Sequence, residues 1–291
     1  MDVHLVDGTY ELFRYFFALP SHETADGREV GAVRGVLGSM LMLLEDGATH
    51  VGVATDHVIE SFRNDLWAGY KDGSAMEPTI MSQFGLLEES LEAMGLVVWP
   101  MVEFEADDAM GAAAVMAATD DRVNRVLICT PDKDLGQVVG GKIVQFDRRK
   151  RVVLDTDGVF DKFGVRPESI ADYLALVGDA ADGFPGLSGW GAKSSSTLLA
   201  RYDHIEDIPL DSSVWDVAVR GGAKLAATLA DDYELALLFR RIATLELDAP
   251  VGDSIDPLLW TGPTPGFAAL CESIDGPELS ARANRLAERR G

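Results

Sequence analysis

Short apolar segments alternate with helix-like segments along the first half of this chain, and this alternation constrains the fold more than any other feature. The apolar segments cover residues 3–6, 50–55, 96–99 and 125–129. Each has the length and apolar character of a buried strand, and a helical spacing of apolar residues occupies stretches such as 27–44 between them. The order predicts an α/β fold in which helices flank both faces of a mostly parallel sheet.

Acidic residues stand at the ends of these predicted strands. Asp7 and Asp56 directly follow the first two, the third leads to Glu105, and Asp132 and Asp134 follow the fourth. The carboxyl ends of parallel strands share one edge of a sheet, and ligands bind beyond that edge. Four acidic strand exits on one edge therefore predict a site for divalent metal ions.

The densest acidic stretch holds Glu105, Asp107 and Asp108, directly before a run of small residues at 109–118 that is typical of a buried helix. Acidic residues are common in the first turn of a helix, because the helix dipole and its free N–H groups stabilise them. Burying several close carboxylates is nevertheless costly unless a cation compensates. Since the same chemistry recurs at the other strand ends, metal binding is the favoured interpretation.

A glycine-rich segment follows a shift in composition at residues 164–167, which we interpret as a domain boundary. Asp179 and Asp182 are three residues apart and would share one face of a helical turn. The segment then runs through Gly186, Gly189 and Gly191 to Lys193, before a helix expected at 194–201. Such a turn either holds a phosphate on free backbone N–H groups or serves as a tight connection between two helices.

The charge balance argues against a non-specific nucleic-acid binder. The chain has 48 acidic and 25 basic residues, a net charge of −23 and a pI of about 4.4, whereas phosphate contacts need Lys and Arg. An enzyme that meets phosphates through metal ions and a few local basic groups remains compatible with it. The basic run Arg148-Arg149-Lys150-Arg151, in the turn of a predicted hairpin, is either a solvated turn or a phosphate contact.

Other features place the chain among cytoplasmic proteins without a membrane segment. No apolar run approaches the roughly 20 residues of a membrane span, and acidic residues interrupt the N-terminus where a signal peptide would be apolar. Cys129 and Cys271 are far apart, form no metal-ligand spacing and are expected to be free thiols in a reducing compartment.

Taken in order, the motifs resemble the bacterial and phage 5′ nucleases, the flap endonuclease and 5′-3′ exonuclease group that also forms the N-terminal part of DNA polymerase I. The resemblance covers roughly residues 3–248. Its motifs are Val6-Asp7-Gly8, the segment from Ser61-Phe62-Arg63 to Tyr70-Lys71, Glu105-Ala106-Asp107-Asp108, Thr130-Pro131-Asp132-Lys133-Asp134-Leu135, and the segment from Gly178-Asp179 to Gly191 and Lys193.

The resemblance implies a PIN-like nuclease domain at residues 1–165, with a helical arch near 59–94. It also implies a helix-hairpin-helix DNA-binding region at 166–260, and leaves 261–291 as a linker and tail. In this family two Mg²⁺ or Mn²⁺ ions are bound by oxygen ligands. The resemblance gives the first ion Asp7, Asp56, Glu105, Asp107 and Asp108, places Asp132 between the ions, and gives the second Asp134, Asp179 and Asp182.

The same resemblance assigns roles to basic and aromatic residues. Lys71 matches the arch lysine that contacts the scissile phosphate, while Arg63 and Tyr70 help to shape this gateway. Gly186, Gly189, Gly191 and Lys193 match the hairpin that binds duplex phosphates, often together with a K⁺ ion. The chain departs from the pattern in three places: Ser74 replaces an arch arginine, Gly183 replaces an asparagine, and the pair Ser194-Ser195 replaces Thr-Ala.

We therefore expect a stand-alone, metal-dependent 5′-3′ exonuclease or flap endonuclease that acts on flap, branched or gapped DNA in repair or replication. It would be monomeric and would work beside a separate DNA polymerase. Two alternatives stay open. A catalytically weak paralogue that binds branched DNA or a repair partner would suit the acidic charge, and a PIN-type ribonuclease would share the nuclease domain.

Overall fold

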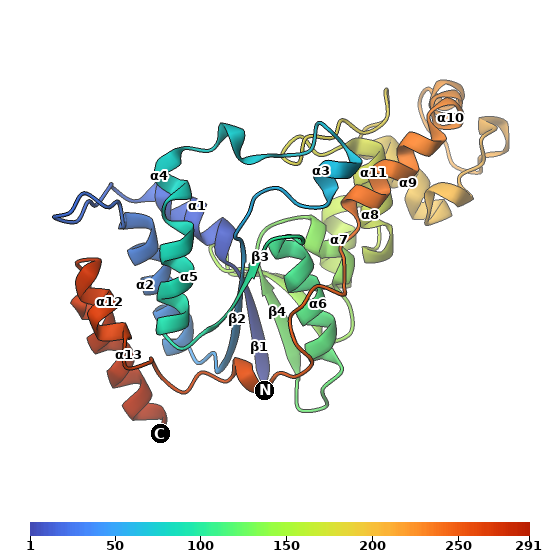
Figure 1. Cartoon of the computed structure of the whole chain (residues 1–291). Coiled ribbons are helices and arrows are strands. Elements are labelled where there is room, and N and C mark those ends of the chain that lie inside the picture. The colour runs from blue at the N-terminus through green and yellow to red at the C-terminus, as the bar shows by residue number, and fades with distance from the viewer.

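A six-stranded sheet forms the centre of the molecule (Figure 1). The computed structural model describes residues 1–291, apart from the side chain of Ala75. The strand order is β3-β2-β1-β4-β5-β6, with the first five strands parallel and β6 antiparallel to β5. The strands are β1 (Asp2–Asp7), β2 (His50–Asp56), β3 (Val97–Met101), β4 (Arg125–Cys129), β5 (Ile143–Asp147) and β6 (Val152–Leu154). The predicted mostly parallel sheet is therefore confirmed.

Helices cover both faces of the sheet. In the first 165 residues they are α1 (Gly8–Ala18), α2 (Gly31–Glu45), α3 (Arg63–Leu66), α4 (Pro78–Met81), α5 (Phe84–Ala93), α6 (Ala106–Ala118) and α7 (Thr156–Phe163). The later ones are α8 (Ile170–Val177), α9 (Ala192–Tyr202), α10 (Gly222–Asp231), α11 (Tyr233–Ala243), α12 (Phe267–Ser273) and α13 (Pro277–Arg290). No helix among the described residues is both long enough and apolar enough to span a membrane.

Alternation of side chains along the strands creates a core on each face. Val3 and Leu5 of β1 pack with α6 on one face, while Val6 packs with α1 and α2 on the other. The same alternation continues in β4, whose Val126 and Ile128 face α6. A parallel sheet buried on both faces needs this continuous apolar character, which is why these strands could be predicted from composition alone.

The segment at residues 57–83, which we call the strap, connects β2 to α5 across the carboxyl ends of the strands (Figure 1). It contains only two four-residue helices, α3 and α4, and one short 3₁₀ turn at Gly73–Ala75. Helices α4 and α5 are separated by Ser82 and Gln83, where the chain leaves the helix. There the fully buried Gln83 accepts a hydrogen bond from the N–H group of Val33 at 3.4 Å.

Helices α8 to α11 form a second hydrophobic core beside the sheet (Figure 1). Phe184 and Phe239 lie at its centre, with ring centroids 5.5 Å apart. Trp67 of the strap packs edge-on against Phe239 at 5.1 Å, so this core also holds the strap. The helical region is therefore tied to the sheet domain through the strap.

The segment at 261–291, predicted as a linker and polar tail, folds instead as the helical pair α12 and α13. Leu279, Ala283 and Leu286 lie on one face of α13 and are buried in the core that includes α2 and α5. Arg282 donates two hydrogen bonds to Glu45 on α2, at 2.9 and 2.7 Å. The high content of charged residues hid a narrow apolar stripe with the helical spacing i, i+4, i+7.

Replacing Ala283 with Asp should destabilise the protein by about 3 kcal/mol, because Ala283 is fully buried and the new charge would have no partner. The matched control is Asn284→Asp, which adds the same charge at the neighbouring exposed position. Urea denaturation of the purified variants measures the difference. Equal midpoints for the two variants would show that α13 does not contribute to the folded core.

Candidate active site

Carboxylates from five parts of the chain meet at the carboxyl edge of the sheet. Asp7 ends β1 and Asp56 ends β2. Asp107 stands in the first turn of α6, and Asp132 and Asp134 follow β4. The loop after α8 adds Asp179 and Asp182. The edge that the sequence predicted as a metal site therefore collects side chains that are up to 175 residues apart in the chain.

Two groups of three carboxylates have the spacing of a metal site. Asp107, Asp132 and Asp134 form one, and Asp134, Asp179 and Asp182 form the other; within each, the oxygens that could bind an ion lie within 4.8 Å of one another. Asp134 belongs to both groups. Asp132, which the resemblance placed between the ions, belongs only to the first group.

Hydrogen bonds from the backbone and from threonines fix the carboxylates at the strand ends. Asp7 accepts from the N–H group of Tyr10 at 2.7 Å and from the hydroxyl of Thr130 at 2.9 Å. Asp56 accepts from the N–H group of Ala106 at 2.8 Å, at the N-terminus of α6. Helix N-termini stabilise negative charge, so these two carboxylates are held in place by α1 and α6.

The crowding of these groups disfavours their charged forms. Burial raises the pKa of Asp7 to about 7, and the charges of Asp56 and Asp132 add to this shift. Burial, together with the neighbouring charge of Asp132, also raises the pKa of Asp107 and of Asp134 well above the ordinary range. A cation bound between them would reverse these shifts, because it favours the deprotonated oxygens.

The donor set suits a hard divalent cation. All the clustered side chains offer carboxylate oxygen, with no Cys or His among the two groups, which is the ligand chemistry of Mg²⁺ and Mn²⁺. One oxygen of Asp134, Oδ1, is buried and has no hydrogen-bond partner. A buried acceptor without a donor is rare, and a bound ion would satisfy it.

Two lysines neutralise part of the cluster. The ammonium group of Lys71 lies 2.8 Å from Glu105 Oε2 and 3.0 Å from Asp182 Oδ1. That of Lys133 bonds to Asp179 and lies 3.9 Å from Asp134. The sequence analysis assigned no role to Lys133, although it lies in the motif Thr130 to Leu135. Its position between Asp132 and Asp134 in the sequence could have indicated that it pairs with the carboxylates.

Arg63, which the resemblance placed at the gateway, is buried. Its guanidinium group donates to both oxygens of Asp108 at 2.8 Å and lies 3.3 Å from Glu105. It also donates to the carbonyl oxygens of Ile242 and Thr244. Arg63 therefore joins the strap, α6 and the end of α11, and acts as a positioning residue.

Asp108 is likewise not placed with the other predicted metal ligands. It is fully buried, and its two oxygens accept from Arg63 and from the N–H groups of Glu105 and Glu246 at 2.9 and 2.8 Å. We therefore remove Asp108 from the ligand set. Asp107 and Asp108 are adjacent in the first turn of α6 but point in different directions. Asp107 faces the edge of the sheet, whereas Asp108 points into the protein, and the sequence alone does not distinguish the two.

Glu105 connects the strap to the cluster. Its Oε1 accepts from the hydroxyl of Ser61 at 2.6 Å, and its Oε2 accepts from that of Tyr70 at 3.1 Å. Burial opposes the charge of Glu105, but Lys71 and Arg63 outweigh this effect and lower its pKa. Tyr70 is only 5% exposed, so its ring supports Glu105 instead of presenting a surface to DNA.

The strap and the loop after α8 approach each other closely. The N–H group of Lys71 donates to the carbonyl oxygen of Asp182 at 2.9 Å, and Trp67 Nε1 donates to that of Gly183 at 3.1 Å. Gly183 has a φ of +83°, and a Cβ atom there would overlap the carbonyl oxygen of Gly69. Glycine at position 183, where the family pattern has asparagine, therefore allows the close contact between the strap and the loop after α8.

The glycine-rich turn connects α8 to α9. Gly186 has a φ of +69°, and a Cβ there would overlap the last turn of α8, so it is required for this tight connection. Gly191 precedes α9, where its N–H group donates to Ser194 Oγ at 3.1 Å. Lys193 is exposed in the first turn of α9. Both interpretations of the turn, a tight connection and a phosphate contact, are compatible with this geometry.

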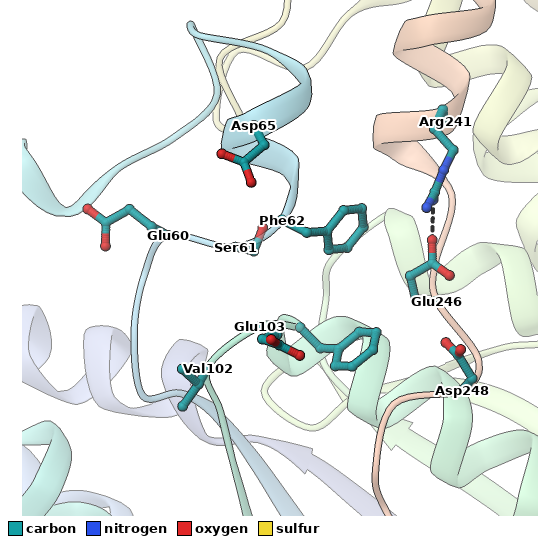
Figure 2. A pocket seen from close by; sticks show the side chains of 10 residues that line it. Glu60, Ser61, Phe62, Asp65, Val102, Glu103, Arg241, Glu246 and Asp248 are labelled. Atoms are coloured by element: carbon teal, nitrogen blue, oxygen red, sulfur yellow. Dashed lines mark hydrogen bonds and ion pairs between the residues drawn. The ribbon is translucent and has the colours of Figure 1, made fainter.

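A separate pocket, shown in Figure 2, lies beside α3, and none of the clustered carboxylates lines it. Phe62 and Phe104 form one wall, with ring centroids 6.4 Å apart. Arg241 stacks on Phe62 at 5.2 Å and pairs with Glu246. The carboxylate cluster, rather than this pocket, carries the chemistry predicted from the sequence.

Comparison with known proteins identifies the family. The family described as 5′-3′ exonuclease, N-terminal resolvase-like domain, matches residues 2–164, and the one described as 5′-3′ exonuclease, C-terminal SAM fold, matches residues 165–265. The chain belongs to the 5′-3′ exonuclease family. The resemblance inferred from the motifs is thereby confirmed.

Relatives in this family include both long and short proteins. The chain is 36% identical to DNA polymerase I of Pseudomonas aeruginosa over 264 residues, which are 87% of the chain and 28% of that protein. It is 27% identical over 253 residues to a 5′-3′ exonuclease of Buchnera aphidicola, covering 86% of the chain and 88% of that exonuclease. The chain spans only 25 to 34% of the length of the first four relatives, all DNA polymerases I.

Solved structures of nucleases share the fold. The T5 5′-exonuclease with bound zinc ions superimposes with a TM-score of 0.68 at 16% identity, covering 99% of both chains. The flap endonuclease-1 of Methanococcus jannaschii gives 0.57 at 17% identity, covering 100% of this chain and 93% of that one. The catalytic core of Rad2 in complex with DNA substrate gives 0.64 at 15% identity over 97% and 91%.

Arg63→Met should destabilise the protein by about 3 kcal/mol or more, because Asp108 and Glu105 would keep buried charges without their main partner. Arg241→Met is the matched control, since Arg241 pairs with Glu246 at the surface, and exposed pairs contribute about 1 kcal/mol or less. Denaturant midpoints of the metal-free proteins measure both effects. Similar losses in the two variants would contradict the positioning role of Arg63.

Asp7→Asn should stabilise the metal-free protein more at pH 7 than at pH 5, by a difference on the order of 2 kcal/mol. The folded protein holds a proton on Asp7 up to about pH 7 that the unfolded chain releases near its ordinary pKa of 3.8, so Asp7 lowers stability as pH rises through that window. Denaturation in EDTA at both pH values measures this. Asp253→Asn, which removes a carboxylate at an exposed position, is the matched control.

Proposed function

We propose that this protein is a metal-dependent 5′-3′ exonuclease or flap endonuclease that hydrolyses phosphodiester bonds in flap, branched or gapped DNA. The observation that carries the proposal is the pair of carboxylate groups that share Asp134 at the open edge of the sheet. Two adjoining oxygen-only groups at one edge suit a pair of divalent ions on one phosphodiester. Membership of the 5′-3′ exonuclease family supports the same reaction.

In this proposal the chain supplies ligands, a phosphate contact and positioning groups. Asp7, Asp56, Glu105, Asp107 and Asp132 would hold one ion, and Asp134, Asp179 and Asp182 the other, with Asp132 and Asp134 nearest the boundary. Two Mg²⁺ or Mn²⁺ ions, when bound, would activate the attacking water and stabilise the leaving oxygen. No protein nucleophile is required.

Lys71 is the proposed contact to the scissile phosphate. It lies on the strap, and its ammonium group already sits among carboxylates of both parts of the cluster. Burial opposes its charge, but Glu105 and Asp182 raise its pKa well above the ordinary value, so it stays protonated. In the proposed reaction the ammonium group of Lys71 would donate a hydrogen bond to a phosphate oxygen that gains charge in the transition state.

We further propose that the turn from Gly186 to Lys193 grips duplex DNA. The exposed Lys193 at the start of α9 suits phosphate oxygens, and a K⁺ ion at Gly186, Gly189 and Gly191 would strengthen the contact. Structures with similar folds include Rad2 in complex with DNA substrate. Tyr70 supports this function only indirectly, through its hydrogen bond to Glu105.

The proposed setting is DNA repair or replication in the cytoplasm. The protein would act as a monomer beside a DNA polymerase, because several relatives carry the same region within DNA polymerase I. A catalytically weak paralogue that binds branched DNA is the second candidate, favoured by the net charge of −23 and by Ser74 in place of the arch arginine. A PIN-type ribonuclease leaves the helical region α8 to α11 without a role.

Cleavage of a 5′-labelled DNA flap should require Mg²⁺ or Mn²⁺ and should stop in EDTA. Asp132→Ala and Lys71→Ala should each lower the rate by about a hundredfold or more, because they remove a metal ligand and a transition-state contact. Asp253→Ala, which changes an exposed carboxylate, should keep the rate of the unmodified protein. Thermal unfolding of each variant verifies that it is folded.

The outcomes separate the candidates. Tight flap binding without product in either metal would favour the weak paralogue. Faster cleavage of RNA than of DNA flaps would favour the ribonuclease. Undiminished cleavage by a folded Asp132→Ala variant would contradict the site assignment.

A further inference from the structure

Five arginines surround one groove in a chain whose net charge is −23. The groove has a volume of about 710 Å³, and Arg14 of α1, Arg125 of β4, and Arg148, Arg149 and Arg151 of the β5–β6 turn all line it. These residues are a fifth of the 25 basic residues of the protein. We call this site the arginine groove.

The arginine groove lies on the sheet face that carries α1 and α2. Leu127 faces that side in β4, and Phe146 extends the same row in β5. Helix α6 covers the opposite face of these strands. Met42 of α2, which is 52% exposed, adds apolar surface to the groove, whereas Leu43, Ala48 and Leu127 on the same wall are buried.

Internal ion pairs account for only part of the positive charge. Arg14 and Arg148 both pair with the buried Glu11, and Arg125 lies 2.9 Å from Asp2. Asp46 is the remaining carboxylate on the wall. Arg149 and Arg151 are exposed, and no carboxylate of the described residues lies within ion-pair distance of either. The groove therefore has an excess of positive charge.

Two buried nitrogen atoms without hydrogen-bond partners lie beside the groove. Arg14 Nε and His4 Nδ1 are buried and make no hydrogen bond among the described residues. Burial, assisted by Arg148 and Arg125 and opposed by Asp2, lowers the pKa of His4 to about 4, so at neutral pH the imidazole adds no charge. Unsatisfied donors of this kind are uncommon in folded proteins, and an acceptor from a ligand would satisfy the guanidinium.

None of the clustered carboxylates lines the arginine groove. Met1, Asp2 and Thr49 line the end beside the amino ends of β1 and β2. Arg149 and Arg151 stand in the turn after β5, whose carboxyl end lies at the same edge of the sheet as that of β4. The groove therefore extends along the face of the sheet towards the edge that carries the carboxylates. Figure 1 shows the N-terminus at the lower end of β1.

We propose that the arginine groove binds an acidic peptide segment of a partner protein, in which Asp or Glu residues flank a bulky apolar side chain. The exposed arginines would pair with the acidic side chains, and the apolar residue would contact Phe146 and Met42. Arginine rims around apolar or aromatic floors are typical of protein interfaces. A nucleic-acid strand fits less well, because its phosphates need basic groups throughout and gain nothing from apolar surface.

Fluorescence anisotropy with a labelled peptide tests this inference. The probe is a short peptide of Asp and Glu residues around one Phe, and its comparison peptides replace either the acidic residues or the Phe with Ser. The double variant Arg149→Glu/Arg151→Glu should bind the acidic probe at least about tenfold more weakly than the unmodified protein. Arg285→Glu/Arg289→Glu on the exposed side of α13 makes the same charge change and should bind it normally.

Flap cleavage and binding of a labelled single-stranded oligonucleotide in EDTA complete the test. Both double variants should keep the cleavage rate and the oligonucleotide affinity of the unmodified protein. Ser in place of the probe's Phe should also weaken binding, since it removes the contact to Phe146 and Met42. The inference is overturned if the acidic probe does not bind, if the two double variants bind it equally, or if the change at 149 and 151 selectively weakens the oligonucleotide.

Discussion

Electrostatic repulsion among carboxylates at one sheet edge is the constraint on which the rest of this structure depends. Parallel strands deliver Asp7, Asp56 and Asp132 to the same edge, and α6 and the loop after α8 add Asp107 and Asp179. Burial makes this repulsion stronger, as the raised pKa of Asp7 shows. Such an edge is stable only if protons, lysines or metal ions neutralise it, so the fold and the capacity to bind cations cannot be separated.

The strap neutralises part of this negative charge, and it also connects the sheet domain to the hydrophobic core of α8 to α11. Its Lys71 brings positive charge to Glu105 and Asp182, while Arg63 neutralises Asp108 below the surface. Trp67 anchors the strap in the core of α8 to α11. Movement of the helical region would therefore shift Lys71 relative to the carboxylates, which links the part proposed to grip DNA with the part proposed to cut it.

Sequence reasoning found the elements that depend on local pattern. The strands were predictable because buried parallel strands are continuously apolar, and the strand-end acids followed from topology. The sequence does not show which side of α6 each acidic residue faces, so Asp108 was predicted to be a metal ligand together with Asp107. It also does not show the partner of Arg63, because Asp108 lies 45 residues away in the chain. The α13 stripe was missed since its few apolar residues need α2 to become a core.

The departures from the family pattern take on a physical meaning once these contacts are known. Gly183 is not simply a lost asparagine, because any side chain there would separate the strap from the loop that carries Asp182. The basic run at 148–151 is divided in its role: Arg148 pairs with Glu11 inside the protein, while Arg149 and Arg151 remain exposed. In a strongly acidic chain, positive charge is thus concentrated at a few places. Lys71 and Lys133 serve the carboxylate edge, and the arginine groove holds its excess charge along the sheet face that carries α1 and α2.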